Sequence, residues 1–264
     1  MNGITGPVDL ARRDVRDALA AYLVALADDE LLIGHRHSEW TGFAPDIESD
    51  IALSSIAQDE LGHARLFYDH AGTLLSQSPD ELAFGRQPVA FRNAILVERP
   101  NGDWGYTIVR LFLYDLADQV RLEALASGSH RPLAELAAAV RREEKYHVSY
   151  GEQWLRRLAG GSKDSHTRVQ EALNRAWPEA TGLFEPVAGH QTLLEAGIVS
   201  GSASEQMGRW QQSVRDVATD IGLQVGSTPP QGGGGGRTGR HSEDLQILVD
   251  EMTSVWRLDP KAKW

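Results

Sequence analysis

The sequence contains no cysteine among its 264 residues. Disulfide bonds, thiolate zinc sites and cysteine-ligated iron–sulfur clusters are therefore excluded for this chain. Any metal that it binds must use histidine and carboxylate ligands. The N-terminal stretch lacks the apolar segment of a secretory signal, and no apolar run approaches the roughly 20 residues that span a bilayer. We therefore expect a cytosolic protein that does not enter a membrane.

Positive charge is also scarce. The 26 Lys and Arg residues are outnumbered by 37 Asp and Glu residues, the formal net charge is −11, and no dense basic run occurs. Most of such a surface would repel a phosphate backbone, which argues against nucleic acid as a partner.

Convincing strand patterns are missing as well. Short apolar stretches such as AILVE (94–98) leave strand and helix open.

Helical periodicity accounts for most of the chain. Apolar residues recur at steps of three and four in four long segments, near residues 9–40, 46–75, 104–127 and 132–160. Short loops join the first segment to the second and the third to the fourth, so each pair should form an antiparallel hairpin. Residues 76–103 hold most of the mid-chain turn residues and are predicted to form a long crossover. The predicted fold class is all-α, a four-helix bundle of two hairpins with additional C-terminal helices.

The last third of the chain should add smaller elements. Amphipathic helices are expected within 166–177 and 203–222, interrupted after the first by Pro178 and Pro186, and packed around the bundle. The Gly- and Pro-rich tract STPPQGGGGGRTGR cannot form a core and is predicted to be a flexible linker. A Ser cap and an apolar stripe follow it and predict a final helix that docks on the bundle. The predicted division is a bundle at 9–226, a linker at 227–240 and a docking helix within 241–264.

Ionisable residues interrupt the core stripes of all four long helices at matching heights. In chain order they are Glu30, Glu60, His63, Asp115, Glu144 and His147. Each hairpin supplies one lone carboxylate and then a Glu-x-x-His pair; Glu60 follows Glu30 by 30 residues, and Glu144 follows Asp115 by 29. Residues three apart share one helix face, so each pair can bind one ion. Four carboxylates and two imidazoles suit two iron or manganese ions.

This arrangement is the one found in ferritin-like di-iron carboxylate bundles, where two helices give a Glu and two give Glu-x-x-His. Asp59 and Glu143 precede the pairs at equivalent positions. Each is expected to accept the second N–H of the imidazole on the opposite helix, as metal-bound histidines require. Asp115 departs from the pattern because it is one methylene shorter than Glu, and Asp118 or Glu123 could be the ligand instead.

A metal-free polar core is the competing interpretation. Buried carboxylates repel one another by several kcal/mol per close pair, at an effective dielectric constant of about 20. Salt bridges to Lys145, Arg110 or Arg65 could relieve that repulsion without an ion. His37 and His70 lie on the same stripes and are expected to be hydrogen-bonded core residues or helix-end cations rather than ligands. Three tryptophans are expected to be packing anchors: Trp40, Trp104 and Trp154.

Several longer motifs are shared with one protein family. They are GHRHSEW (34–40), DIALSSIAQDELGHARLFY (50–68), FRNAILVERPNGDW (91–104), EEKYHVSYGEQWLRRL (143–158) and RHSEDLQILVDEM (240–252). Together they resemble the C-subunit family of phenylacetate degradation, from about residue 12 to Trp264. The resemblance implies membership of the multicomponent phenylacetyl-CoA epoxidase, a bacterial di-iron monooxygenase that converts phenylacetyl-CoA and dioxygen to the ring-1,2-epoxide.

The resemblance also implies the partners. In that family the catalytic iron belongs to a paralogous A subunit, and the C subunit is an accessory protein that forms a heterodimer with it. A small B subunit, another accessory protein and a flavin and iron–sulfur reductase that takes electrons from NADPH complete the system. One feature departs from a purely structural role, because all six candidate ligands in this chain are metal-competent. A self-sufficient di-iron oxidase or oxygenase therefore stays open, whereas the C-terminal extension disfavours an iron-storage protein.

Overall fold

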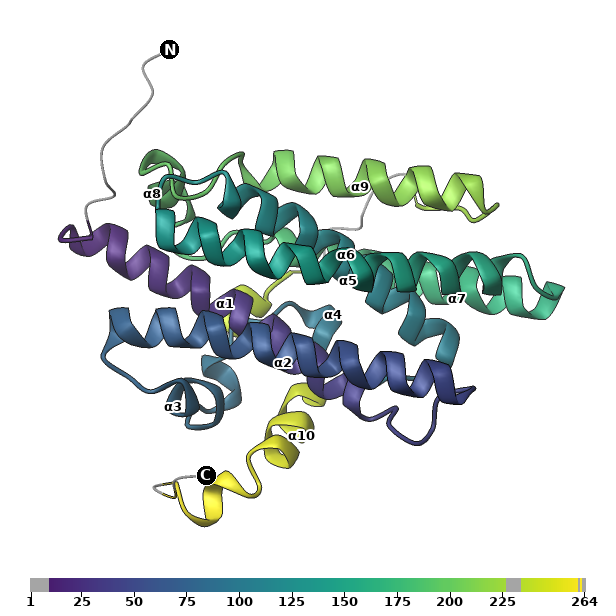
Figure 1. Ribbon diagram of the computed structural model, residues 1–264, viewed down its shortest axis with the longest axis horizontal. Helices are drawn as coiled ribbons and strands as arrows, with labels where there is room; N and C mark the ends of the chain where they lie inside the picture. The colour runs from purple at the N-terminus through teal and green to yellow at the C-terminus, as the bar shows by residue number, and fades with distance from the viewer. Residues whose placement is uncertain (1–9, 227–233, 261, 263–264) are drawn as a thin grey trace.

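The four periodic segments form the four longest helices of the computed structural model, which describes residues 10–226, 234–260 and 262. They are α1 (Arg13–Ser38), α2 (Ile47–Leu75), α5 (Trp104–Ala126) and α6 (Arg131–Ala159). α1 packs along α2 and α5 packs along α6 (Figure 1). No strand occurs in the described ranges. The prediction of an all-α, ferritin-like bundle of two hairpins is confirmed.

Side-chain caps fix where the long helices begin. The Asp46 carboxylate accepts a hydrogen bond from the Ser49 backbone N–H (2.8 Å) at the start of α2, and Asp103 does the same for Tyr106 (2.8 Å) at the start of α5. Such caps satisfy backbone donors that the first turn leaves free. Pro132, in the first turn of α6, suits a position where no backbone N–H is needed. These local signals set the height at which each helix enters the bundle.

The crossover is built from short helices. It contains α3 (Pro79–Phe84), the 3₁₀ helix η1 (Pro88–Ala90) and α4 (Ile95–Glu98). The ambiguous stretch AILVE therefore becomes one turn of helix, whose Leu96 and Val97 are buried. Because the crossover lies against α1, it closes one side of the first hairpin.

The C-terminal helices cover the second hairpin. α7 (Lys163–Ala180) and α9 (Ala203–Asp220) both pack on α5, and the Trp177 and Trp210 rings stack between them with centroids 4.9 Å apart. The expectation that Pro178 would interrupt α7 was wrong, because that residue lies inside the last turn and the helix runs on to Ala180. The 3₁₀ helix η2 (Thr181–Phe184) packs on α7 and α9, and α8 (His190–Glu195) packs on α1.

Residues after the glycine tract return to the crossover. Residues 227–233 of the predicted linker lie outside the described residues, whereas 234–240 contain the 3₁₀ helix η3 (Gly236–Thr238). A side chain at Gly236 would collide with the Asn93 carbonyl, so glycine is needed for this close approach. α10 (Glu243–Met252) then packs on α4 and η1, and η4 (Trp256–Leu258) follows. The three-part domain division stays a prediction.

Arg237 of η3 is buried and ties this segment to α1. Its guanidinium donates to both Asp29 oxygens (3.0 and 2.6 Å) and to the Ala25 carbonyl (3.1 Å). Arg121 donates to the same carboxylate (2.6 Å) and to Asp118 (2.8 Å).

No helix in the described ranges combines the length and the apolar character needed to cross a bilayer.

Candidate metal centre

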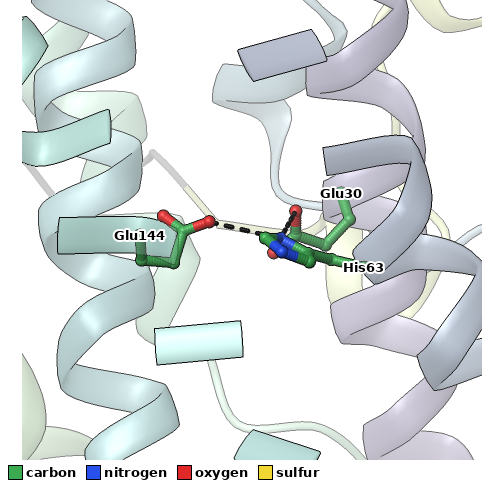
Figure 2. Close-up of side chains that lie close together, drawn as sticks. All are labelled: Glu30, His63 and Glu144. Atoms are coloured by element: carbon green, nitrogen blue, oxygen red, sulfur yellow. Dashed lines mark ion pairs between the residues drawn. The ribbon is translucent and has the colours of Figure 1, made fainter. Parts of the chain in front are cut away.

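The six candidate ligands meet in the core of the bundle as two groups of three. The first group is Glu30, His63 and Glu144, and the second is Glu60, Asp115 and His147. In each group one ligand atom of every residue lies within 4.8 Å of the other two, and all six residues are buried. Figure 2 shows Glu30 and His63 facing Glu144 across the space between the hairpins. Each group thus takes residues from both hairpins.

Small residues allow the helices to bring these side chains together. A Cβ on Gly151 of α6 would lie 2.6 Å from Leu111 Cδ2 of α5, and one on Gly34 of α1 would lie 3.2 Å from the Ala57 carbonyl oxygen of α2. The first distance is too short for a real side chain, and the second is tighter than most real contacts. Glycine at these positions therefore lets the paired helices approach closely at the level of the cluster.

The two imidazoles are held from outside by carboxylates of the opposite hairpin. His63 Nε2 of α2 lies 2.8 Å from Glu143 Oε2 of α6, and His147 Nε2 of α6 lies 3.2 Å from Asp59 Oδ2 of α2. We take Nε2–H as the donor in both bonds because an ionised carboxylate can only accept. The Glu143 and Asp59 side chains are 59% and 48% exposed, so these bonds lie at the surface. The Nδ1 atoms are left facing inward.

Glu144 lies between the two groups. Its Oε1 atom is 3.3 Å from His63 Nδ1 and 3.1 Å from His147 Nδ1, while Glu30 Oε2 is 3.7 Å from His63 Nδ1. One carboxylate thus faces both imidazoles.

Burial and mutual charge shift the protonation of the cluster. Burial raises the pKa values of Glu30, Glu60 and Asp115. For Glu144 burial acts in the same direction, but the facing imidazoles outweigh it and lower the pKa to about 2. For the imidazoles burial opposes protonation, and the carboxylates outweigh it.

The resulting pKa of His63 is about 12, chiefly through Glu144 and Glu30, and that of His147 is about 9, chiefly through Glu144. Metal-free protein would hold one carboxylate between two protonated rings.

Several buried atoms at the centre have no hydrogen-bond partner among the described residues. They are both carboxylate oxygens of Glu30, Asp115 and Glu144, and the Nδ1 atoms of His63 and His147. The short distances from Glu144 to the rings do not have hydrogen-bond geometry. A buried polar atom without a partner is costly. Oxygen and imidazole nitrogen donors in this number fit two divalent ions of the iron or manganese type.

The three basic residues that could have neutralised the cluster without a metal ion do not pair with it. Lys145 is exposed, Arg65 pairs with Asp69 (3.3 Å) and Asp80 (3.8 Å), and Arg110 donates to the Arg99 carbonyl (2.5 Å) and to Asn101. Within the described part of the chain, none of these three forms an ion pair with the cluster.

The two residues that could have replaced Asp115 as a ligand have other partners. Asp118 is buried and accepts from Arg121, and Glu123 is half-exposed beside Arg141 and Arg209, so Asp115 is the member of the group.

The outlying histidines behave as core or surface residues. His37 hydrogen-bonds to Glu60 in the core, with Nδ1 2.8 Å from Oε2 and 3.1 Å from Oε1, which confirms the prediction of a hydrogen-bonded core residue. His70 Nδ1 hydrogen-bonds to the Leu66 carbonyl of its own helix (3.1 Å). Sequence reasoning placed His37 on the correct stripe but did not foresee its contact with a candidate ligand. The remaining expectation also holds: Trp40, Trp104 and Trp154 pack edge-to-face on one another.

Comparison with known proteins agrees with the fold and the motifs. The family model described as "Phenylacetic acid catabolic protein" matches residues 4–264. The chain belongs to this family. It is 33% identical to the C subunit of 1,2-phenylacetyl-CoA epoxidase of Escherichia coli K12 over 250 residues, 93% of this chain and 99% of that protein. It is 29% identical to the A subunit of the same enzyme over 164 residues, 58% of this chain and 52% of that protein. The resemblance read from the motifs is confirmed.

Proposed function

We propose that the chain is the C-type subunit of a phenylacetyl-CoA epoxidase and serves phenylacetate catabolism as the accessory partner of an A subunit. One observation carries the proposal: the similarity to the C subunit runs over nearly the whole length of both proteins, whereas the similarity to the A subunit covers about half of each. A small B subunit and a separate reductase with flavin, an iron–sulfur cluster and NADPH would complete a cytoplasmic system. The absence of cysteine supports an external iron–sulfur carrier.

We further propose that the six-residue cluster binds two iron or manganese ions. The buried, unpartnered donor atoms and the externally held imidazoles support this. Glu30, His63 and Glu144 would hold one ion and Glu60, Asp115 and His147 the other. When bound, a pair of iron ions supplies oxygen-activation chemistry. The chain itself contributes ligand orientation through Asp59 and Glu143, and a site from which bulk water is excluded.

The intact ligand set motivates a second candidate function, a self-sufficient di-iron oxidase or oxygenase. The two candidates differ in where turnover occurs. An accessory protein is inactive alone and active only with its A subunit, whereas a self-sufficient enzyme turns over by itself once it holds iron. We favour the accessory role because the full-length similarity is to the C subunit.

Reconstitution tests the choice. Phenylacetyl-CoA and NADPH turnover is measured with the chain and reductase, with the A subunit and reductase, and with all three together, and the metal content of each sample is determined. We expect epoxide only when the A subunit is present. Turnover by the iron-loaded chain and reductase alone would refute the accessory role.

A double variant, Glu60→Ala with His63→Ala, separates scaffold from chemistry. If the chain is a scaffold, the complex assembles and its activity is unchanged, although the variant holds less metal. Lost activity in a complex that still assembles would assign chemistry to this chain's own centre. The control is His70→Ala, because His70 lies on the same helix outside the cluster and hydrogen-bonds to the Leu66 carbonyl.

A further inference from the structure

The two groups of ligands differ in how their carboxylates are held. Both oxygens of Glu60 lie within hydrogen-bond distance of His37 Nδ1, at 2.8 and 3.1 Å. Its counterpart Glu30 has no hydrogen-bond partner for either oxygen among the described residues. Glu60 is therefore held by a hydrogen bond before any ion arrives, whereas Glu30 only faces His63 Nδ1 at 3.7 Å.

His37 is placed for this contact by its helix. It lies seven residues, about two turns, after Glu30 on the stripe of α1 that faces α2, and both His37 and Glu60 are fully buried. A carboxylate that binds a metal ion is ionised and can only accept, so we take Nδ1 as the protonated nitrogen. His37 Nε2 has no partner among the described residues. Among the described residues, the ring is therefore hydrogen-bonded through Glu60 alone.

We infer that His37 is a positioning residue for one of the two ions, and that its Nδ1–H fixes Glu60 so that Glu60, Asp115 and His147 form the preorganised site. The inference rests on the proposed binding of two ions by the cluster. Asp115 gives a physical reason for the difference. Its short side chain reaches less far and has no hydrogen-bond partner of its own among the described residues, so this group depends more on a Glu60 that is already aligned.

Mn²⁺ titration of the full-length, metal-free protein tests the inference, with free Mn²⁺ measured by electron paramagnetic resonance. Wild-type protein should bind two ions. His37→Leu should keep one ion at wild-type affinity and bind the other about 10–100-fold more weakly, the usual effect of losing a partner that orients a ligand. In a His63→Ala background, which disables the first group, the same loss should fall on the one ion that remains.

Two polar variants keep the test valid if His37→Leu does not fold. Asn places an amide N–H near the position of Nδ1, whereas Gln places it near Nε2. His37→Asn should therefore restore the second ion and His37→Gln should not, while His70→Leu should change neither. Equal weakening of both ions, no weakening in any variant, or equal behaviour of Asn and Gln would overturn the inference. Failure of the wild-type protein to bind any ion would instead refute the metal centre on which it rests.

Discussion

Metal binding should release protons, because the imidazoles that would bind the ions are protonated without them. The pKa of His63 is raised to about 12 and that of His147 to about 9, so both rings are charged at neutral pH. An ion on Nδ1 must displace that proton. Each group contains one such ring, so each ion should release at least one proton.

The size of the effect follows directly. One released proton makes the affinity rise tenfold per pH unit, about 1.4 kcal/mol, over the range in which the ring stays charged in metal-free protein. The sign is therefore fixed: binding of each ion should tighten as the pH rises from about 6.5 to about 8.5.

Calorimetry measures the protons directly. Mn²⁺ is titrated into metal-free protein at one pH in two buffers with different ionisation enthalpies, and the difference in heat gives the number of protons released per ion. A His63→Ala variant should release fewer. Fewer than one proton per ion in the wild-type protein, or an affinity that does not change with pH, would refute the protonation assigned to the cluster.

Three stability effects can be measured by urea denaturation. Arg237→Ala removes one of the two cations that neutralise the buried Asp29 and should lower the free energy of unfolding by about 3–5 kcal/mol. Arg240 is exposed in the same segment, so Arg240→Ala should change the free energy of unfolding by less than about 0.5 kcal/mol. Equal effects of the two variants would contradict the burial of Arg237. Gly151→Ala should lower the free energy of unfolding by about 1–3 kcal/mol because the added Cβ clashes with α5. Gly208 of α9 faces open space, so Gly208→Ala should raise the free energy of unfolding by up to about 1 kcal/mol. No change in Gly151→Ala would argue against close packing at that position. With chelator present, the free energy of unfolding should fall as the pH rises from about 7 to about 9, by up to about 1.4 kcal/mol per pH unit for each ring that keeps its proton only in the folded state. A histidine with a raised pKa stabilises the fold fully below the pKa of the unfolded state, and this stability is lost as the pH rises towards the pKa of the folded state. A free energy of unfolding that rises over this pH range would show that the rings are neutral.

The sequence was sufficient for the bundle and for the membership of the cluster because both depend on local spacing. Apolar residues at steps of three and four define which side of a helix is buried, and Glu-x-x-His places both ligands on that side. Capping residues such as Asp46 marked where α2 begins, and nearly equal spacing within the two hairpins, 30 and 29 residues, brought the ligands to one level.

Contacts between residues far apart in the chain were not predictable in this way. Arg237 follows a glycine tract whose composition indicates a flexible linker, yet it pairs with Asp29, 208 positions earlier. The local sequence around either residue does not identify the other as its partner. The bond between His37 and Glu60 was missed for a related reason, since helical periodicity gives the face of a residue but not the direction of its side chain.

Each group of three candidate ligands draws residues from both hairpins, so neither hairpin alone contains a complete group. If the cluster binds ions as proposed, each ion would therefore strengthen the association of the two hairpins. An ion present at 100 times its dissociation constant would add about 2.7 kcal/mol per site to the free energy that keeps the halves together. Under the proposed metal binding, removal of the ions would lower the stability of the contact between the hairpins by the same amount.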